Sequence, residues 1–307
     1  MSVLLPLPQP GCGGRLLREA LRDRPLPIVG SPFALAARLI EDREFPAVYL
    51  SGAAFSAGLL GVPDIGLISL DQLADQTAQL ASSIKLPVVV DADTGFGGPA
   101  DVAACVQRLE AAGAAAIQIE DQNPDKRCGH LAGKQVIETE AMVEKIAAAC
   151  QGRISPDTII IARTDIRGVT TLDDCVSRIH AYHEAGADWV FPEALRSREE
   201  FAVVGETLRQ SGGIGLANMT EFGRSPLLEL EELGDLGFAA VLYPVTLLRL
   251  AMKAIEVGLD LLADEGTQRS LLDLMQTREE LYDLLDYDPA NPDQWRRRLA
   301  PADDTTP

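Results

Sequence analysis

Two short runs of residues carry the side chains in this chain that could do chemistry. The first surrounds a cysteine and reads Lys126-Arg127-Cys128-Gly129-His130. Neighbouring positive charge favours a thiolate over a thiol, so we expect this cysteine to exchange a proton, or to attack an electrophile, near neutral pH. The second run is Val90-Asp91-Ala92-Asp93-Thr94-Gly95-Phe96-Gly97. Together the two runs predict a cysteine acid/base that works beside a metal held by carboxylates.

The aspartate pair in the second run suggests the metal. Asp91 and Asp93 are two residues apart, so in an extended chain their side chains face the same side. Two converging carboxylates suit a hard cation such as Mg²⁺, which prefers oxygen ligands and keeps several waters. A capped turn can produce the same pair, but Glu120 and Glu193 end two other predicted strands at equivalent positions and favour the metal.

The composition of the chain excludes several classes of function. Its 307 residues carry a net charge of −19, which argues against nucleic acid and anionic membrane surfaces as partners. No apolar run approaches the ~18 residues of a membrane helix, and the start of the chain lacks the cationic region of a signal peptide. The five cysteines are typical of a reduced, cytoplasmic protein. We expect Cys12 in an N-terminal coil and Cys105, Cys150 and Cys175 on helices.

Short apolar runs alternate with helical patterns from about residue 27 to about residue 265. Their near-continuous apolarity is typical of strands buried on both faces of a parallel sheet. We predict eight strands, at 27–30, 47–50, 87–91, 115–120, 158–163, 188–193, 213–218 and 238–243. Eight strand–helix units in a chain of this length predict an α/β fold, a (β/α)8 TIM-type barrel. The alternative is an open doubly wound sheet, but a glycine-rich nucleotide loop is missing after the first strand.

The helical segments and the C-terminus complete the predicted organisation. Apolar residues recur at i, i+3, i+4 and i+7 in 102–109 and in 172–179, and Gly113 and Gly186 stand where helices end. We divide the chain into a barrel with an N-terminal helical extension (1–265), a C-terminal helical segment (266–290) and a mobile tail (291–307). Because the C-terminal segment has no place in the barrel, we expect it to pack on a neighbouring subunit, with exchange between subunits.

Polar residues recur at the C-terminal ends of the predicted strands, where active sites of such barrels lie. They are Tyr49, Ser51, Asp91, Asp93, Glu120, Arg163, Asp165, Glu193, Asn218 and Thr220. Arg163, Arg249 and Arg278 are candidate clamps for a carboxylate, since a guanidinium matches it bidentately. His180 and His183 lie on a predicted helix and are explained as structural or surface residues.

These motifs resemble those of the isocitrate lyase / phosphoenolpyruvate mutase superfamily over roughly residues 25–285. The matching runs are Tyr49-Leu50-Ser51-Gly52, Asp91-Ala92-Asp93, Ile119-Glu120-Asp121, Lys126-Arg127-Cys128-Gly129-His130, Ala162-Arg163-Thr164-Asp165 and Phe191-Pro192-Glu193-Ala194. Within the superfamily, Ala217-Asn218-Met219-Thr220-Glu221-Phe222-Gly223 and Met275-Gln276-Thr277-Arg278 look most like the 2-methylisocitrate lyases. One departure is the run Ser51-Gly52-Ala53, where the family often has Ser-Gly-Gly. We expect the added methyl group of Ala53 to affect substrate selectivity.

The resemblance implies a Mg²⁺-dependent cleavage of 2-methylisocitrate to pyruvate and succinate, a step of propionate breakdown through the methylcitrate cycle, with Mn²⁺ as an alternative metal. The implied metal residues are Asp91, Asp93, Asp64 and Glu120. The implied catalytic residues are Cys128, which protonates the succinate carbon, with Lys126, His130 and Tyr49. The base that takes the hydroxyl proton is left open between Tyr49 and a carboxylate of the metal site. The implied substrate-binding residues are Ser51, Gly52, Ala53, Gly129, Arg163, Glu193, Asn218, Thr220, Arg249 and Arg278.

Three other functions compete with this one. Oxaloacetate decarboxylation or phosphonopyruvate cleavage would use the same scaffold, but those relatives typically lack the cysteine run. Isocitrate lyase activity differs only in whether the pocket accommodates a methyl group. A non-catalytic barrel that binds a carboxylate would be expected to lose the thiol or a metal carboxylate, and the sequence keeps both. The implied partners are a small tricarboxylate substrate and further copies of the chain in a homotetramer, with no nucleic acid and no membrane.

Overall fold

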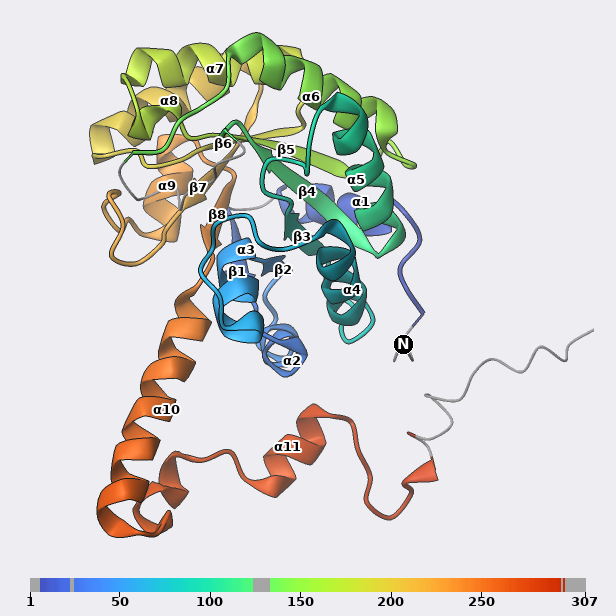
Figure 1. Ribbon diagram of the computed structural model, residues 1–307, viewed down its shortest axis with the longest axis vertical. Helices are drawn as coiled ribbons and strands as arrows, with labels where there is room; N and C mark the ends of the chain where they lie inside the picture. Colours follow the sequence, from blue (N-terminus) through green and yellow to red (C-terminus); the bar gives the residue numbers. More distant parts are fainter. Residues whose placement is uncertain (1–5, 23–24, 124–132, 294, 296–307) are drawn as a thin grey trace, which may run out of the picture.

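Eight parallel strands form a closed barrel at the centre of the computed structural model, which describes residues 6–22, 25–123, 133–293 and 295 (Figure 1). Neighbours in sequence are neighbours in the sheet, and β8 closes the barrel by pairing with β1. The strands are β1 (Leu26–Gly30), β2 (Ala47–Leu50), β3 (Val88–Asp91), β4 (Ala114–Glu120), β5 (Ile159–Thr164), β6 (Trp189–Pro192), β7 (Ile214–Asn218) and β8 (Ala240–Tyr243). All eight predicted strands are confirmed, with their ends within two residues.

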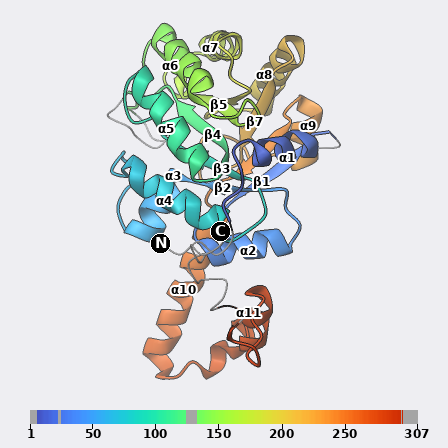
Figure 2. The ribbon, with the colours of Figure 1, turned by 90° about the vertical axis from the view of Figure 1, so that its right-hand side faces the viewer.

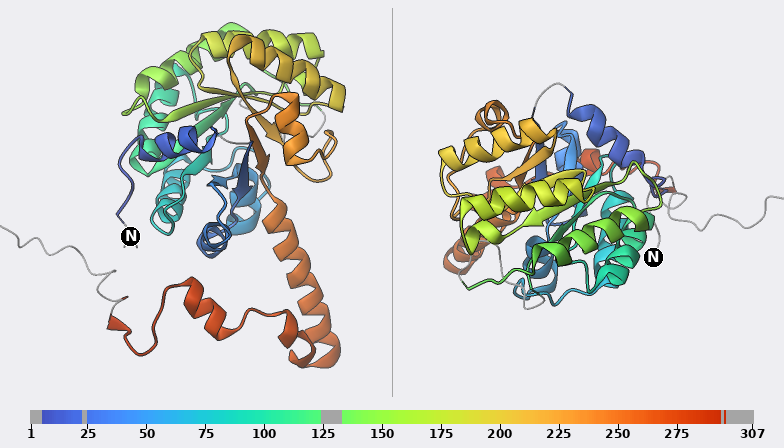
Figure 3. Two further views of the ribbon diagram at one scale, coloured as in Figure 1. Left: turned by 180° about the vertical axis from the view of Figure 1, so that it is seen from behind. Right: turned by 90° about the horizontal axis from the view of Figure 1, so that it is seen from above.

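Most of the helices lie around the barrel, and the last two extend away from it (Figure 3). They are α1 (Cys12–Ala20), α2 (Ala34–Asp42), α3 (Gly52–Phe55), α4 (Leu70–Ala81), α5 (Pro99–Ala111), α6 (Thr139–Gly152), α7 (Leu172–Glu184), α8 (Arg198–Ser211), α9 (Leu230–Leu236), α10 (Thr246–Glu265) and α11 (Arg278–Leu284). Shorter helical turns are Ser56–Leu60, Ile166–Gly168 and Arg269–Leu274. Gly113 and Gly186 have φ of 99° and 104°, which confirms them as the left-handed residues that end α5 and α7.

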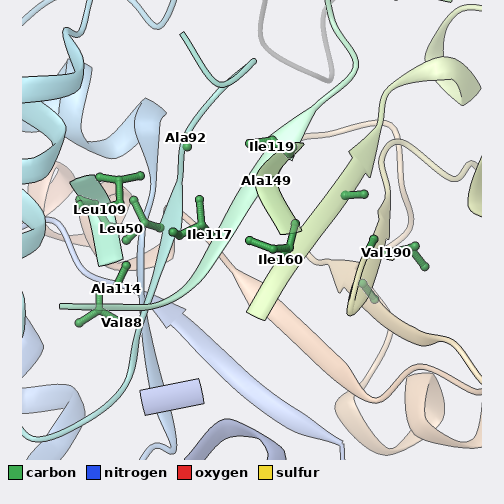
Figure 4. Close-up of a cluster of buried hydrophobic side chains, with 14 of the residues drawn as sticks. Leu50, Val88, Ala92, Leu109, Ala114, Ile117, Ile119, Ala149, Ile160 and Val190 are labelled. Atoms are coloured by element: carbon green, nitrogen blue, oxygen red, sulfur yellow. The ribbon is translucent and has the colours of Figure 1, made fainter. Parts of the chain in front are cut away.

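The alternation of side chains along each strand produces two apolar cores. One lies between the barrel and its helices, and Figure 4 shows part of it, with Val88, Ile117 and Ile160 on the strands facing Leu109 and Ala149 on helices. The other fills the barrel interior and is built mostly from alternate strand residues. Its members include Ile28, Tyr49, Val89, Ile161, Trp189, Leu216 and Leu242. The inward-facing polar side chains, such as Gln118 and Arg163, lie toward the C-terminal ends of the strands.

Helix α1 covers the end of the barrel at which the strands begin. Leu17 is fully buried and belongs to the interior core. Two glycines allow this approach: a Cβ at Gly13 would lie 2.5 Å from the Cβ of Ala115, and one at Gly14 would lie 1.9 Å from the carbonyl oxygen of Asp157. Cys12, which we expected in a coil, is instead the first residue of this helix, because the glycines after it let the helix dock.

The C-terminal helices leave the barrel as an arm, residues 246–285 (Figures 1 and 2). Helix α10 buries none of its residues in this chain, and its exposed apolar side chains include Leu250, Ile255 and Leu259. The arm then turns back, and Arg38 of α2 donates a hydrogen bond to the carbonyl of Leu284 at 3.3 Å. None of the described helices is long and apolar enough to cross a membrane. The predicted tail (291–307) lies mostly outside the described residues.

We expect Leu17→Ala to lower the free energy of unfolding by about 2–5 kcal/mol, because it leaves a cavity in the interior core. Urea unfolding measures the loss. The matched control is Leu16→Ala on the same helix, whose side chain is 48 % exposed and whose loss we expect to stay within about 0.5 kcal/mol. Equal losses in the two variants would contradict the docking of α1 as the closure of the barrel.

Candidate active site

A cavity of about 100 Å³ opens at the C-terminal ends of the strands. Its walls combine predicted site residues with apolar ones from the last strands. The lining residues are Tyr49, Ser51, Ala53, Asp64, Asp91, Arg163, Phe191, Glu193, Asn218, Thr220, Leu242, Pro244, Val245 and Arg249. Most of the site residues that the sequence predicts among the described residues therefore meet in one place.

The register of the strands sets the pairs of side chains around the cavity. Asp91 of β3 stands opposite Gln118 of β4, and Glu120 of β4 stands opposite Arg163 of β5. All four side chains point into the barrel because they continue the inward positions of their strands. A shift of one residue in this register would turn them toward the helices, so the closed barrel itself determines which groups meet.

Arg163 lies at the centre of the buried charges. Its guanidinium donates to Asp165 through Nε (2.9 Å) and Nη2 (3.2 Å), and it also lies 3.3 Å from Glu120 and 3.4 Å from Glu193. The guanidinium packs 5.1 Å from the ring centre of Phe191. Burial by itself would lower the pKa of Arg163, but the attraction of the three carboxylates outweighs it and raises the pKa well above its usual range. The site therefore keeps a fixed positive charge at the cavity wall.

Tyr49, Gln118 and Asp91 form a hydrogen-bonded chain across three strands. The Tyr49 hydroxyl donates to Oε1 of Gln118 at 2.5 Å, and Nε2 of Gln118 donates to Oδ1 of Asp91 at 3.0 Å. Burial, together with the charge of Asp91, raises the pKa of Tyr49 well above its usual range. The phenol is therefore neutral near pH 7, and its proton is directed toward Gln118.

The Asp91 and Asp93 carboxylates converge on Gly52. A Cβ at Gly52 would lie 3.3 Å from Oδ2 of Asp91 and 3.2 Å from Oδ1 of Asp93, so a glycine leaves both carboxylates room. The two carboxylates approach each other as expected, but the extended chain that was expected to bring them together is wrong. The strand ends at Asp91, and Asp93 follows in a turn with a left-handed φ of 50°, which brings its side chain back toward the site.

Carboxylate oxygens dominate the region where a metal would bind. Asp91 and Asp64 line the cavity, while Asp93 and Glu120 are buried behind its wall. Among the described residues, no three His, Cys, Asp or Glu side chains gather closely enough to hold a metal by themselves. This arrangement fits Mg²⁺, which commonly takes one or two carboxylates and completes its octahedron with water and substrate.

The opposite wall of the cavity is built by β6, β7 and the start of α10. Nδ2 of Asn218 donates to Oε2 of Glu193 at 3.0 Å, and the other carboxylate oxygen accepts from the backbone of Ala194 at 2.8 Å. Arg249 lies on the outer rim with a side chain that is 50 % exposed, 3.5 Å from Glu221. Thr220 and Arg249 both line this side of the cavity.

Several predicted residues are not part of this cavity. Arg278 begins α11 on the arm and is exposed, so this chain does not bring it to its own site. Lys126, Cys128, Gly129 and His130 lie outside the described residues. The described residues on either side of that segment pair with each other, because Gln122 forms an antiparallel bridge with Val136 and the Asn123 amide donates to the carbonyl of Gln135.

Sequence reasoning missed three residues of this region. Gln118 interrupts an otherwise apolar strand before its final glutamate, and that interruption is a signal that could have been used. Phe191 was part of a matching motif, but its packing against Arg163 requires the fold. Asp165 was noted at a strand end without a role, and the structure makes it the closest acidic partner of Arg163.

Comparisons with known proteins agree with the fold. A profile of the family described as phosphoenolpyruvate phosphomutase matches residues 28–262. A 2-methylisocitrate lyase of Aeropyrum pernix is 46 % identical over 283 residues, which are 92 % of this chain and 89 % of that protein. The crystal structure of a 2,3-dimethylmalate lyase, described as a PEP mutase/isocitrate lyase superfamily member, is 33 % identical and superimposes with a TM-score of 0.81, covering 91 % of this chain and 92 % of that one.

A further solved structure is a phosphonopyruvate hydrolase in complex with oxalate and Mg²⁺. It is 26 % identical, has a TM-score of 0.77, and covers 93 % of this chain and 96 % of its own. The profile spans most of the barrel, and the relatives align over nearly the whole chain. The chain therefore belongs to the PEP mutase/isocitrate lyase superfamily.

Proposed function

We propose that the protein is a carbon–carbon lyase that cleaves 2-methylisocitrate to pyruvate and succinate. The observation that carries the proposal is one cavity whose wall presents both the Arg163 guanidinium and the Asp91 carboxylate. The first suits a substrate carboxylate, and the second suits a metal that binds the substrate's hydroxyl group. The name of the relative from Aeropyrum pernix supports the choice of substrate.

The binding of a tricarboxylate requires local positive charge, because the chain as a whole carries −19. Arg163 and Arg249 supply fixed charges on two sides of the cavity, and Asn218 and Thr220 supply polar groups between them. Ser51, Gly52 and Glu193 complete the proposed binding set. The Ala53 methyl lines the same cavity, so it contributes to the choice between 2-methylisocitrate and isocitrate.

The superfamily is metal dependent, and we propose Mg²⁺ for this site, with Mn²⁺ as the alternative. Asp91 would bind the metal directly, and Asp64, Asp93 and Glu120 would hold its water ligands. A bound divalent cation supplies electrophilic stabilisation to the hydroxyl and carboxylate oxygens of the substrate. The phosphonopyruvate hydrolase complex with Mg²⁺ supports this choice.

The proton transfers are assigned to residues of this chain. A base takes the hydroxyl proton, the bond between the hydroxyl carbon and the adjacent succinate carbon breaks, and pyruvate forms. The electron pair stays on the succinate carbon, where the neighbouring carboxylates are held by Arg163 and the polar wall. Cys128 then donates a proton to that carbon, with Lys126 and His130 stabilising the resulting thiolate and Gly129 beside it. The base that takes the hydroxyl proton is a group beside the metal site, either the Tyr49 phenol or a carboxylate of that site.

The substrate test compares pyruvate release from 2-methylisocitrate, isocitrate and oxaloacetate with Mg²⁺ present, with glyoxylate assayed in parallel. We expect a kcat/KM for 2-methylisocitrate at least about tenfold above that for isocitrate, the size of effect that one methyl group gives in a pocket. Glyoxylate from isocitrate at a higher rate would make the protein an isocitrate lyase. Pyruvate from oxaloacetate alone would make it a decarboxylase on the same scaffold.

The role of Cys128 is tested by Cys128→Ser. We expect turnover to fall by about a thousandfold or more, since a hydroxyl is a far weaker acid than a thiol. The affinity for 2-methylisocitrate, measured by calorimetry with Mg²⁺, should stay close to wild type. Cys175→Ser provides a control, because this buried thiol lies on α7 in the outer core. Full activity in Cys128→Ser would remove the cysteine from the mechanism.

We also propose that the chain works as a homo-oligomer, expected as a tetramer. Helix α10 leaves its apolar side chains exposed within one chain, and a second copy would cover them. Arg278 on the same arm would then reach the site of a neighbouring copy. Sedimentation at micromolar concentration should give an oligomer, and Leu250→Glu with Leu259→Glu should weaken it. A monomeric wild-type protein with full activity would contradict this arrangement.

A further inference from the structure

A buried ion pair lies next to the cavity without belonging to its wall. Nζ of Lys134 is 2.6 Å from Oδ1 of Asp165, and the two side chains are 1 % and 0 % exposed. The removal of an ammonium and a carboxylate from water costs several kcal/mol for each ion, so such a pair persists only where both charges are closely compensated. Neither residue is needed to fill the apolar core.

Asp165 connects this lysine to the arginine of the site. Oδ1 of Asp165 accepts from Lys134 at 2.6 Å and from Nη2 of Arg163 at 3.2 Å, while Oδ2 accepts from Nε of Arg163 at 2.9 Å. One carboxylate oxygen is therefore shared between the two cations. The position of the Arg163 guanidinium depends on how strongly Asp165 attracts it.

The surroundings fix the backbone on both sides of the ion pair. Oδ1 of Asp121 accepts from the backbone amide of Asp165 at 2.8 Å, and the Asp121 carbonyl accepts from the amide of Ile137 at 2.9 Å. Oδ2 of Asp121 in turn accepts from Arg178 and Tyr182, each at 2.8 Å. The backbone around Asp165 and the segment that follows Lys134 are thus tied to one buried residue, Asp121, the first through its carboxylate and the second through its carbonyl.

We propose that Lys134 is a positioning residue that holds Asp165 so that Arg163 presents its guanidinium to a substrate carboxylate. The inference rests on the proposed function of the cavity. Without the lysine ammonium, Asp165 loses one of its two cationic partners and attracts the Arg163 guanidinium more strongly. Arg163 then compensates Asp165, Glu120 and Glu193 without the second buried cation. The cavity also becomes more negative by one charge, which weakens the binding of an anionic substrate.

Gly168 provides a second way to disturb the lysine. A Cβ at this position would lie 2.2 Å from Cε and 2.5 Å from Nζ of Lys134. The lysine end is flexible and can move aside, and Gly168 does not have a left-handed φ, so Gly168→Ala displaces the ammonium without straining the backbone. This variant changes no charge, and Gly168 is not among the lining residues of the cavity.

The experiment measures KM and kcat for 2-methylisocitrate, and Kd for succinate by calorimetry, in Lys134→Met, Gly168→Ala and the double variant. We expect Lys134→Met to raise KM and Kd by about tenfold while kcat falls by less than about threefold, the pattern of lost ground-state binding. Gly168→Ala should change KM and Kd in the same direction. The double variant should match Lys134→Met, because both changes remove the same contact.

Arg153→Met is the matched control. It breaks another part-buried ion pair, with Asp188 at 2.7 Å, near the opposite ends of the strands. It should lower Tm and leave KM and Kd unchanged. If Lys134→Met lowers Tm but leaves KM and Kd at wild-type values, the lysine is only structural and the inference is overturned. If Lys134→Met fails to fold, KM and Kd of Gly168→Ala are the test instead. Wild-type values of both in that variant overturn the inference.

Additive effects in the double variant would also overturn the inference, because Gly168→Ala would then act by another route. Failure of the proposed function is recognised separately in the wild type. A wild-type protein that releases no pyruvate from 2-methylisocitrate refutes the lyase proposal. In that case the succinate Kd of the variants still tests whether Lys134 positions Arg163.

Discussion

Compensation of buried charge at one end of the barrel constrains the rest of this structure. Arg163 lies among Asp165, Glu120 and Glu193, Lys134 pairs with Asp165, and all five side chains are nearly withdrawn from water. Isolated ions would not be stable there, so each charge is kept by its neighbours. The surplus of carboxylates over cations also explains why a divalent cation suits the site. The removal of any one member would change the electrostatics of the whole cavity.

The barrel provides the geometry that this charge compensation needs. Parallel strands in sequential order bring their carboxyl ends to one face, and the register places Gln118 beside Asp91 and Arg163 beside Glu120. Below this polar layer the interior core excludes water, and at the opposite end α1 closes it with Leu17. Residues that stabilise the fold and residues of the candidate site thus lie at different levels along the barrel axis, a division that is common in this fold.

The sequence contained most of this arrangement, because apolar runs mark buried strands and polar residues at their ends must meet in a barrel. Asp91, Arg163, Glu193 and Asn218 were predictable on that basis. The turn at Asp93 was not, since a left-handed φ at an aspartate leaves little trace in the sequence. The pairing of Lys134 with Asp165 joins residues 31 apart through the fold. The location of Arg278 depends on how the arm packs, which a single chain does not specify.

The most direct test of the account is a crystal structure of the Cys128→Ser variant with 2-methylisocitrate and Mn²⁺, whose anomalous scattering locates the metal. We predict the metal beside the Asp91 carboxylate and a substrate carboxylate within hydrogen-bonding distance of the Arg163 guanidinium. A metal bound away from the strand ends, or a substrate that does not contact Arg163, would contradict the assignment of this cavity as the active site.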